Sequence, residues 1–371
     1  MAQARVLVIG AGVIGLTTAL SLRQEGFEVV VIADNFAPTT SVAAGALWEW
    51  PPSVCGSHYD EALLNRSQAW CAPSYRKFSE LAQGTNTGVF LRPATFYFRI
   101  PVRDNPNELG KTLKLRTHVA GFLHAPELAE RNGVSPHAGV VDAYTYVAPM
   151  IDTDAYLDWL RLQVTQTGCE LLERHISGSL AEQQRTLLTS FRAEAIANCT
   201  GLGSQELATD RHLAPHRGAL IFVRNDGTHM PRVNGAHCIA HDTAQDRQDM
   251  VFIVPRGENQ LVLGGLIEPD EWTLEVDLQN HPPIREMLQR CVDFLPILAN
   301  AQLDEREPVR VGLRPFRGSG VRLEREPGTR IIHNYGHGGS GFTLSWGCAF
   351  EAVGLVTQML DLQPRVIARP S

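Results

Sequence analysis

The sequence lacks the features typical of secreted, zinc-binding and membrane-spanning proteins. Its 371 residues include seven cysteines, which are scattered and never spaced as CxxC, so neither a disulfide framework nor a zinc site is indicated. No long apolar run follows the N-terminal segment. The net charge is -7, without a long block of one sign, which argues against a surface that binds nucleic acid.

These absences favour a protein of the reducing cytoplasm. The apolar N-terminal stretch is interpreted as a strand and a helix rather than a signal peptide, because it holds three spaced glycines and only Arg5 precedes it as a charge. The final letters, IARPS, differ from the peroxisomal signal SKL. The length suggests two domains, although one large α/β unit is also possible.

The segment VLVIGAGVIGLTTAL has the order of a nucleotide-binding βαβ unit. Residues 5–9 predict a strand, a glycine-rich turn follows, and residues 16–24 predict a helix. A second apolar strand ends in an acid, where such units bind the ribose hydroxyls. Glycines let the backbone approach a pyrophosphate, whose charge is met by N–H groups at the helix N-terminus. The expected contacts, which do not distinguish NAD from FAD, are Gly10, Gly12, Val13, Ile14, Gly15 and Asp34.

A stretch of small residues, PTTSVAAGALW, follows the second strand. Its hydroxyl groups and its glycine suit a backbone that lies along a long cofactor and donates hydrogen bonds to phosphates. An ordinary loop would have a similar composition. The contacts expected from this stretch are Thr40, Ser41, Ala44, Gly45 and Leu47.

Nucleotide-type strands alternate with longer antiparallel strands in the rest of the chain. A helix is predicted over 57–88, and a second over 153–167 with Thr153 as its N-cap. A hairpin is predicted within 250–265. This interleaving indicates an α/β (α+β) fold in which a mixed or antiparallel-sheet domain is inserted into a discontinuous nucleotide-binding domain. The predicted nucleotide domain is 1–50, 135–212 and 310–371, and the predicted substrate domain is 51–134 and 213–309.

The segment HCIAH places His237 and His241 four residues apart, and Asp242 follows. On a helix this spacing could begin a metal site. The flanking residues indicate a strand, however, and no third ligand is evident. A solvated or hydrogen-bonded pair is therefore favoured, and no metal is expected.

A second glycine-rich turn lies in IIHNYGHGGSGFTLSWG, residues 331–347. It again has the order strand, turn, helix, and its helix N-terminus could stabilise a reduced, anionic flavin. Together with VGLRPFRG just before it, this stretch closely resembles the D-amino-acid oxidase family of FAD enzymes, within the superfamily that includes glycine oxidase. The segments VLVIGAGVIGL, AAGALW, NCTG, HRG and FIVP extend the resemblance over nearly the whole chain.

The resemblance implies a Rossmann-type FAD-binding domain and oxidative deamination of D-amino acids. Hydride passes from the substrate to the flavin and dioxygen is then reduced, so the products are a 2-oxo acid, ammonia and hydrogen peroxide. The first turn would bind the diphosphate of FAD and the last would lie against its ring system, so that one cofactor joins the two ends of the chain. A homodimer is possible, and neither nucleic acid nor membrane is expected as a partner.

The resemblance also assigns roles to residues of the last turn and the strand before it. Arg314 would bind the substrate carboxylate through two parallel hydrogen bonds, a geometry that lysine provides less well. The carbonyl of Gly339 would accept a hydrogen bond from the substrate amine. The groups expected around the flavin are Gly338, Gly339, Gly341, Phe342 and Thr343.

Three positions depart from the family pattern. Phe252 replaces a tyrosine that touches the substrate carboxylate, so a hydrogen bond of about 1.5–3 kcal/mol would be missing. Glu49 replaces a glutamine; it could favour a cationic substrate side chain, or it could pair with a neighbouring arginine or lie exposed. The tyrosine of the family's lid falls near Gln248, in a polar stretch.

Three other functions are not excluded by the sequence. A glycine- or sarcosine-type amine oxidase shares the fold and the chemistry. A nicotinamide dehydrogenase would use only the first turn and would leave the second one unexplained. A catalytically altered flavin-binding protein would fit the changes at Phe252 and at the lid.

Overall fold

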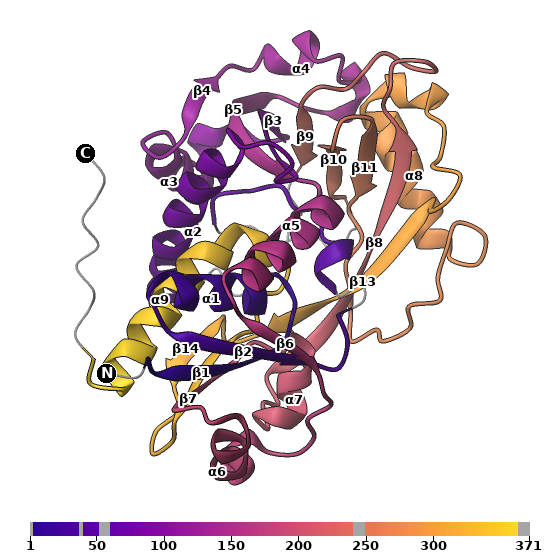
Figure 1. Ribbon diagram of the computed structural model, residues 1–371. Coiled ribbons are helices and arrows are strands. Elements are labelled where there is room, and N and C mark those ends of the chain that lie inside the picture. Colours follow the sequence, from indigo (N-terminus) through magenta and orange to yellow (C-terminus); the bar gives the residue numbers. More distant parts are fainter. Residues whose placement is uncertain (1–2, 37–39, 52–59, 240–248, 363–371) are drawn as a thin grey trace.

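The computed structural model describes residues 3–36, 40–51, 60–239 and 249–362, which form two β-sheets with helices packed against them (Figure 1). The first sheet has six strands within these residues, in the order β14–β15–β7–β1–β2–β6. They are β1 (Arg5–Ile9), β2 (Glu28–Ala33), β6 (Glu170–Glu173), β7 (Ala195–Asn198), β14 (Arg322–Arg325) and β15 (Ile331–Tyr335). All neighbours are parallel except β14 and β15.

Helices cover the first sheet on both faces. Alternate residues of β1 point to opposite sides, so Val6 and Val8 contribute to one apolar core while Leu7 and Ile9 contribute to another. Burial on both faces explains the near-continuous apolar letters of these strands. The helices of the described residues, including those that pack against the second sheet, are α1 (Val13–Gln24), α2 (Glu61–Leu81), α3 (Pro106–Leu115), α4 (Leu128–Arg131), α5 (Thr153–Gln166), α6 (Leu180–Phe191), α7 (Ser204–Leu207), α8 (Pro282–Phe294) and α9 (Gly341–Met359).

The second sheet has nine strands in the described residues, in the order β12–β8–β11–β10–β9–β3–β5–β4, and β13 pairs with β8. Only the β3–β9 pair is parallel among them, so the sheet is mixed. The strands are β3 (Val89–Phe98), β4 (Ala120–His124), β5 (Asp142–Ile151), β8 (Leu213–Arg224), β9 (Ala236–Ile239), β10 (Val251–Arg256), β11 (Gln260–Gly264), β12 (Glu268–Pro269) and β13 (Val309–Arg317).

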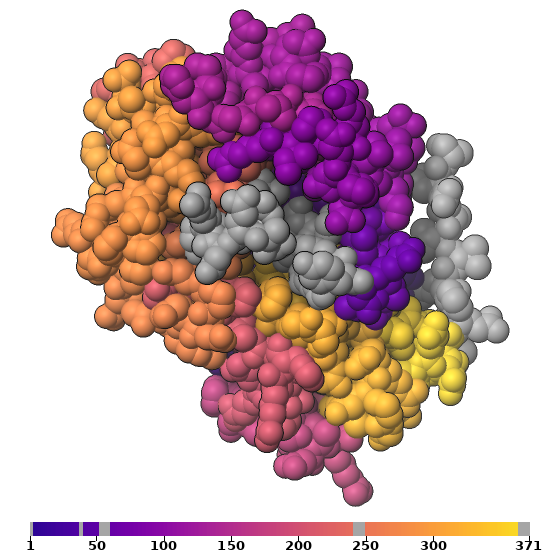
Figure 2. Space-filling view, turned by 180° about the vertical axis from the view of Figure 1, so that it is seen from behind, coloured from indigo at the N-terminus to yellow at the C-terminus, as the bar shows by residue number. Residues whose placement is uncertain are grey.

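The two faces of the second sheet pack against different partners. Phe96 and Val254 lie in the same core as residues of α1, α2 and α9, so this face looks toward the first sheet and its helices. Tyr97 and Ile253 point the other way and pack with α8. Figure 2 shows that segments distant in sequence lie together on one face of the molecule, namely those near residue 100, near residue 280 and toward the C-terminus.

The predicted fold class is confirmed, and the differences are local. The segment predicted to be helical over 57–88 contains α2. The predicted N-cap Thr153 is wrong by one residue: Asp152 caps α5 through a bond from the N–H of Ala155. Thr153 is instead the first helical residue, and its hydroxyl donates to the carbonyl of Val42 at 2.8 Å.

Two strands lie in a different sheet from the one that the predicted domain ranges suggest. The range 135–212, assigned to the nucleotide domain, contains β5, which pairs with β3 and β4 in the nine-stranded sheet. The range 310–371 begins within β13, which pairs with β8. The domain boundaries themselves stay a prediction. No helix in the described part of the chain is both long and apolar enough to span a membrane.

Candidate cofactor and substrate site

The first glycine-rich turn joins β1 to α1 at the carboxyl edge of the parallel sheet. Gly10 has a φ of +108°, and a Cβ there would lie 2.4 Å from the carbonyl oxygen of Cys199. A Cβ on Gly15 would lie 1.9 Å from the carbonyl oxygen of Gly10. Both positions therefore require glycine, and the backbone of Gly10 and Gly12 stays partly exposed in front of α1.

The segment after β2 returns to this turn. A 3₁₀ turn, η1, covers Thr40–Ala43, and the hydroxyl of Ser41 accepts a hydrogen bond from the N–H of Val13 at 3.0 Å. Beyond η1, the guanidinium of Arg256 donates to the carbonyl oxygens of Ala44 and Gly45. Arg256 is buried, and it fixes the stretch that the sequence predicts to lie along the cofactor.

The last turn lies beside the first. A Cβ on Gly341, the first residue of α9, would be 3.6 Å from Cγ1 of Val13, the first residue of α1. The positive ends of two helix dipoles are thus adjacent. Gly338, at a φ of +55°, donates its N–H to the carbonyl of Pro315 at 2.9 Å, which holds the turn on β13. Gly339 is exposed.

The remaining predicted cofactor contacts surround these helix ends. Asp34 follows β2, the parallel neighbour of β1, and Oδ1 of its carboxylate accepts a hydrogen bond from Nδ1 of His175 at 3.0 Å. Leu47 forms a bridge with Met150 of β5 and joins the segment to the second sheet. Ile14 is half-buried, and Phe342 and Thr343 are buried in the first turn of α9.

These features fit the FAD that the sequence predicts. A dinucleotide needs closely approachable backbone at its phosphates and positive potential near its anionic groups. The two obligatory glycines of the first turn provide the approachable backbone. The adjacent N-termini of α1 and α9 provide the positive potential. Because these starts come from opposite ends of the chain, one extended ligand could contact both.

Arg314 is a desolvated cation without a carboxylate partner among the described residues. Its Nη1 donates to the carbonyl oxygens of Arg217 at 3.3 Å and Leu266 at 3.1 Å. Burial lowers the pKa of Arg314 to about 10, so it stays charged at neutral pH. Since an unpaired charge is costly inside a protein, this arrangement favours an anionic ligand.

Two glycines allow close packing of the segments around Arg314. A Cβ on Gly218 of β8 would lie 2.2 Å from Nη1 of Arg314, so the guanidinium rests directly on that backbone. A Cβ on Gly312 of β13 would lie 2.6 Å from Cβ of Ala43, which brings η1 onto the same strands. Gly218 and Arg256 are supporting residues that the sequence argument did not assign. The segment HRG and the arginine that follows FIVP are the sequence signals that could have indicated them.

Phe252 forms an apolar wall next to the cofactor segment. A Cβ on Gly45 would lie 2.6 Å from its ring, and a Cβ on Gly264 would lie 3.2 Å from Cδ1. The ring therefore fills the space between the backbone of Gly45 and that of β11. This placement brings Phe252 to the segment predicted to hold the cofactor, and it offers no hydroxyl there.

Glu49 pairs with a lysine. Nζ of Lys111 in α3 lies 3.0 Å from Oε1 of Glu49, and the lysine side chain is only 4% exposed. This contact favours the second role considered for Glu49, in which a neighbouring cation pairs with the carboxylate. The partner is a lysine from a distant helix rather than an arginine, which spacing in the sequence could not reveal.

His237 lies on the opposite face of the second sheet. Its Nδ1 is 2.9 Å from the hydroxyl of Tyr97, and burial lowers its pKa to about 4. His241, Asp242 and Gln248 lie outside the described residues, as does the altered lid. Within the described ranges, no group of three or more His, Cys, Asp or Glu residues is arranged to hold a metal ion.

A buried acid anchors the base of the last turn. Oδ2 of Asp210 accepts hydrogen bonds from Nε of Arg317 at 2.7 Å and from the hydroxyl of Tyr335 at 2.8 Å. Tyr335 immediately precedes Gly336, where a Cβ would lie 2.9 Å from Cβ of Arg317. Burial alone would raise the pKa of Asp210, but the hydrogen bonds from Arg317 and Tyr335 hold that pKa below its ordinary value.

We expect Asp210→Asn to destabilise the protein by about 3 kcal/mol at pH 7, because Arg317 would lose its counterion. Because the pKa of Asp210 is depressed in the folded protein, the stabilisation by its charge is complete above the ordinary Asp pKa of about 4. It is lost as the pH falls through the folded-state pKa. Urea unfolding from pH 7 downward should show the two proteins converging in acid. A difference in the free energy of unfolding that stays constant with pH would contradict this. Asp158→Asn, at an exposed position, serves as the control.

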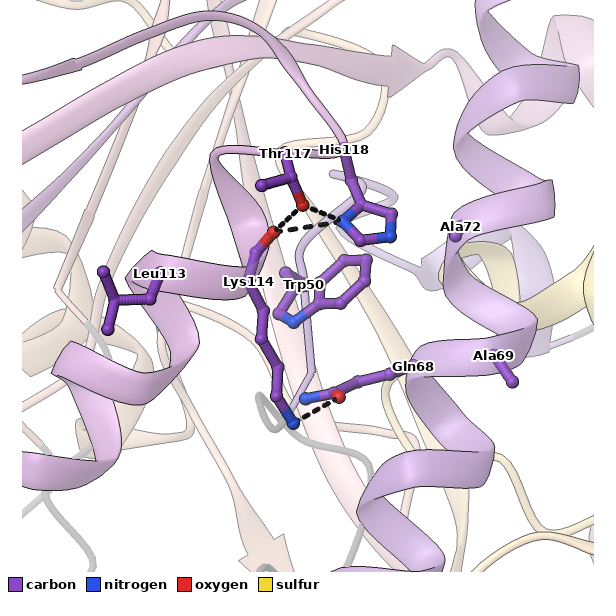
Figure 3. A pocket seen from close by; sticks show the side chains of 8 residues that line it. All are labelled: Trp50, Gln68, Ala69, Ala72, Leu113, Lys114, Thr117 and His118. Atoms are coloured by element: carbon purple, nitrogen blue, oxygen red, sulfur yellow. Dashed lines mark hydrogen bonds between the residues drawn. The ribbon is translucent and has the colours of Figure 1, made fainter.

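A separate hollow of about 440 Å³ lies between α2 and α3 (Figure 3). Trp50 and His118 line it with ring centroids 4.5 Å apart, and Nζ of Lys114 donates to Oε1 of Gln68 at 3.1 Å. None of the predicted site residues lines this hollow.

Comparisons with known proteins identify the family of the chain. A family model described as FAD dependent oxidoreductase (DAO) matches residues 5–355. The D-amino-acid oxidase of Streptomyces coelicolor is 34% identical over 95% of this chain and 96% of its own length. That of Rubrobacter xylanophilus is 36% identical over 96% and 97%. Human D-aspartate oxidase is 31% identical over 96% of each chain.

Solved structures show the same fold at lower identity. Glycine oxidase from Bacillus cereus has a TM-score of 0.69 at 18% identity and covers 99% of this chain and 100% of its own. Iminodiacetate oxidase from Chelativorans has a TM-score of 0.72 at 18% identity, with 98% and 97% covered. The predicted fold class and the predicted cofactor, FAD, are thereby confirmed. The chain belongs to the D-amino-acid oxidase family of FAD-dependent oxidoreductases.

Proposed function

We propose that this chain oxidises D-amino acids, with dioxygen and water as co-substrates and a 2-oxo acid, ammonia and hydrogen peroxide as products. The observation that carries the proposal is Arg314, a desolvated guanidinium with no carboxylate partner in the described part of the chain. It lies on the strand that also contacts η1 and the last turn. An α-amino acid supplies the carboxylate that such a site lacks.

The chain's own groups would bind and orient the substrate. The planar guanidinium of Arg314 suits bidentate binding of the α-carboxylate. The carbonyl of Gly339, on the exposed part of the last turn, would accept a hydrogen bond from the amine. Phe252 would exclude water from one side. These contacts fix the α-carbon in one orientation, which is the main contribution expected of the protein in a cofactor enzyme.

FAD, when bound, supplies the acceptor for the substrate hydride. The diphosphate would lie at Gly10, Gly12, Val13, Ile14 and Gly15, with Asp34 at the ribose. The stretch from Thr40 and Ser41 through Ala44, Gly45 and Leu47 would follow the cofactor. Gly338, Gly341, Phe342 and Thr343 would stand at the ring system, where the dipole of α9 supports negative charge.

We also propose the two-domain division given above, a homodimer and a cytoplasmic location. The six cysteines of the described residues are all buried and none forms a disulfide with another of them, which suits a reducing compartment. Static light scattering would test the dimer. Limited proteolysis would test whether the sheets separate as domains.

The reaction is tested by its stoichiometry. Purified enzyme incubated with D-alanine in air should release pyruvate, ammonia and hydrogen peroxide in equal amounts. Glycine and sarcosine in the same assay test the alternative that glycine oxidase and iminodiacetate oxidase suggest by their fold. Turnover of glycine or sarcosine in preference to every D-amino acid would contradict the proposal in favour of that alternative.

Phe252→Tyr should increase kcat/KM for D-alanine by about tenfold, because the new hydroxyl can donate a charge-assisted hydrogen bond to the substrate carboxylate. The gain should appear mainly in KM, and it should also tighten the binding of propanoate, which shares only the carboxylate. Phe252→Leu, which adds no donor, is the control. An unchanged propanoate affinity in the tyrosine variant would show that position 252 does not face the carboxylate.

A further inference from the structure

A buried arginine binds the backbone of the cofactor segment, residues 40–47. Arg256, the last residue of β10, is only 2% exposed. Its Nη2 donates to the carbonyl oxygens of Ala44 and Gly45, and its Nη1 donates to Oγ1 of Thr153 at 2.9 Å. The hydroxyl of Thr153 donates in turn to a carbonyl of η1. One guanidinium therefore fixes three carbonyl groups of this segment, two directly and one through Thr153.

The N–H groups at the end of the same segment lack acceptors in the described part of the chain. The N–H of Ala44 donates to the carbonyl of Ser41, but no hydrogen bond joins the N–H of Gly45, Ala46 or Leu47 to another described residue. Ala46 and Leu47 are buried, and buried N–H groups in proteins almost always have a partner. A ligand that carries acceptor atoms, as FAD does, would provide the missing partners.

The backbone of Ala46 has an uncommon conformation. Its φ of +51° lies in the left-handed region, which residues other than glycine rarely adopt. Such a conformation persists only where the surrounding structure imposes it. On one side, Arg256 binds the carbonyl of Gly45 at 3.2 Å, and on the other the N–H of Ile151 donates to the carbonyl of Ala46 at 3.0 Å. These two contacts hold the chain at Ala46 between β10 and β5.

The charge of Arg256 has only neutral partners within the described residues. Burial lowers its pKa to about 10, and the negative charge of Asp152 partly opposes that decrease, so the guanidinium stays charged at neutral pH. A buried charge of this kind adds little to the stability of a fold, because the loss of hydration offsets its hydrogen bonds. We therefore expect an apolar side chain at position 256 to leave the stability of the FAD-free protein nearly unchanged.

We propose that Arg256 is a positioning residue for the cofactor. By binding the carbonyls of Ala44 and Gly45, it holds Ala46 in its left-handed conformation and keeps the N–H groups of residues 45–47 available to FAD. Arg256 acts through this backbone and does not touch the cofactor itself. The inference rests on the contacts proposed above between this segment and FAD, and it is independent of which substrate the enzyme oxidises.

Titration of the FAD-free protein with FAD, followed by the quenching of flavin fluorescence, tests the inference. Arg256→Met should raise the Kd for FAD by about thirtyfold, while the midpoint of thermal unfolding of the FAD-free protein should change by no more than about 3 °C. Arg256→Lys keeps the charge, but its single nitrogen cannot lie near all three acceptors, so we expect an increase of about tenfold. Arg92→Met is the matched control, because Arg92 also donates to a backbone carbonyl, that of Gly257, and it should change neither quantity.

A second substitution separates positioning from a general loss of packing. Ala46→Gly introduces a residue that adopts a positive φ without strain. In the Arg256→Met background, Ala46→Gly should lower the Kd for FAD by about fivefold or more, because the backbone no longer needs to be held. In the wild-type background it should change the Kd by less than about threefold. A defect caused by disturbed packing of the sheet would not respond to this change.

The outcomes for the inference and for the proposed function can be told apart. The inference is wrong if Arg256→Met binds FAD within about threefold of the wild type, or if Ala46→Gly does not restore affinity to it. A wild-type protein that binds FAD but oxidises no D-amino acid would overturn the proposed function and leave the FAD titrations to decide the inference. Should Arg256→Met not fold, Arg256→Lys with and without Ala46→Gly decides in the same way: a weaker affinity that glycine restores supports the inference, and an unchanged affinity overturns it.

Discussion

Arg314→Met should lower kcat/KM for D-alanine by about a thousandfold, which is the loss expected when one partner of a desolvated charge pair is removed. Arg314→Lys keeps a positive charge but loses the planar fork, and we expect a loss of about a hundredfold. Steady-state kinetics under saturating oxygen would measure both. The protein should still purify with FAD, because the hydrogen bonds of Arg314 within the described residues go to backbone carbonyls.

A second variant tests whether the position of Arg314 matters as well as its charge. A Cβ on Gly218 would overlap the guanidinium, with Nη1 at 2.2 Å and Cζ at 2.5 Å. Gly218→Ala should therefore displace Arg314 and raise KM for D-alanine, although no charge is removed. Gly227→Ala, at a position where a Cβ would meet nothing within 4 Å, controls for the substitution itself. Full activity of Arg314→Met would contradict the assignment of the carboxylate site.

Gly10→Ala should give a protein that does not retain FAD. The new Cβ would lie 2.4 Å from a backbone oxygen at Cys199, and the φ of +108° is strained for alanine. We expect stability to fall by about 3 kcal/mol or more and FAD binding to weaken at least a hundredfold, since the turn must shift. Flavin absorbance after purification and thermal unfolding of the FAD-free proteins would measure the two effects separately.

The control for Gly10→Ala lies in α9. A Cβ on Gly354 would meet nothing within 4 Å, so Gly354→Ala should keep the flavin and leave stability unchanged or slightly higher. If Gly10→Ala purified yellow with the stability of the wild type, the first turn would not be the site of the cofactor diphosphate.

The parts of the fold that the sequence predicts are those set by local chemistry. Residues 5–34 combine an apolar strand, obligatory glycines, a helix and a terminal acid, so the βαβ unit is fixed by contacts close in sequence. The second turn is predictable for the same reason. Arg314 follows from its motif, and the structure adds why the side chain is available: within the described residues its partners are carbonyls, not carboxylates.

Contacts between distant segments account for what the sequence could not predict. The ion pair of Glu49 joins residues 62 positions apart, and no local pattern at Lys111 marks it. Asp210 and Tyr335 are 125 positions apart. The sequence misplaces the N-cap of α5 because Asp152 and Thr153 are both good caps. In the fold, the hydroxyl of Thr153 donates to a carbonyl more than a hundred residues away.

The most direct test of the account is the visible spectrum of the purified protein, followed without oxygen while D-alanine and then L-alanine are added to separate samples. We expect a yellow flavoprotein whose visible absorbance is bleached by the D-isomer and left unchanged by the L-isomer. A colourless protein that cannot be reconstituted with FAD, or a flavin that the L-isomer bleaches and the D-isomer does not, would contradict it.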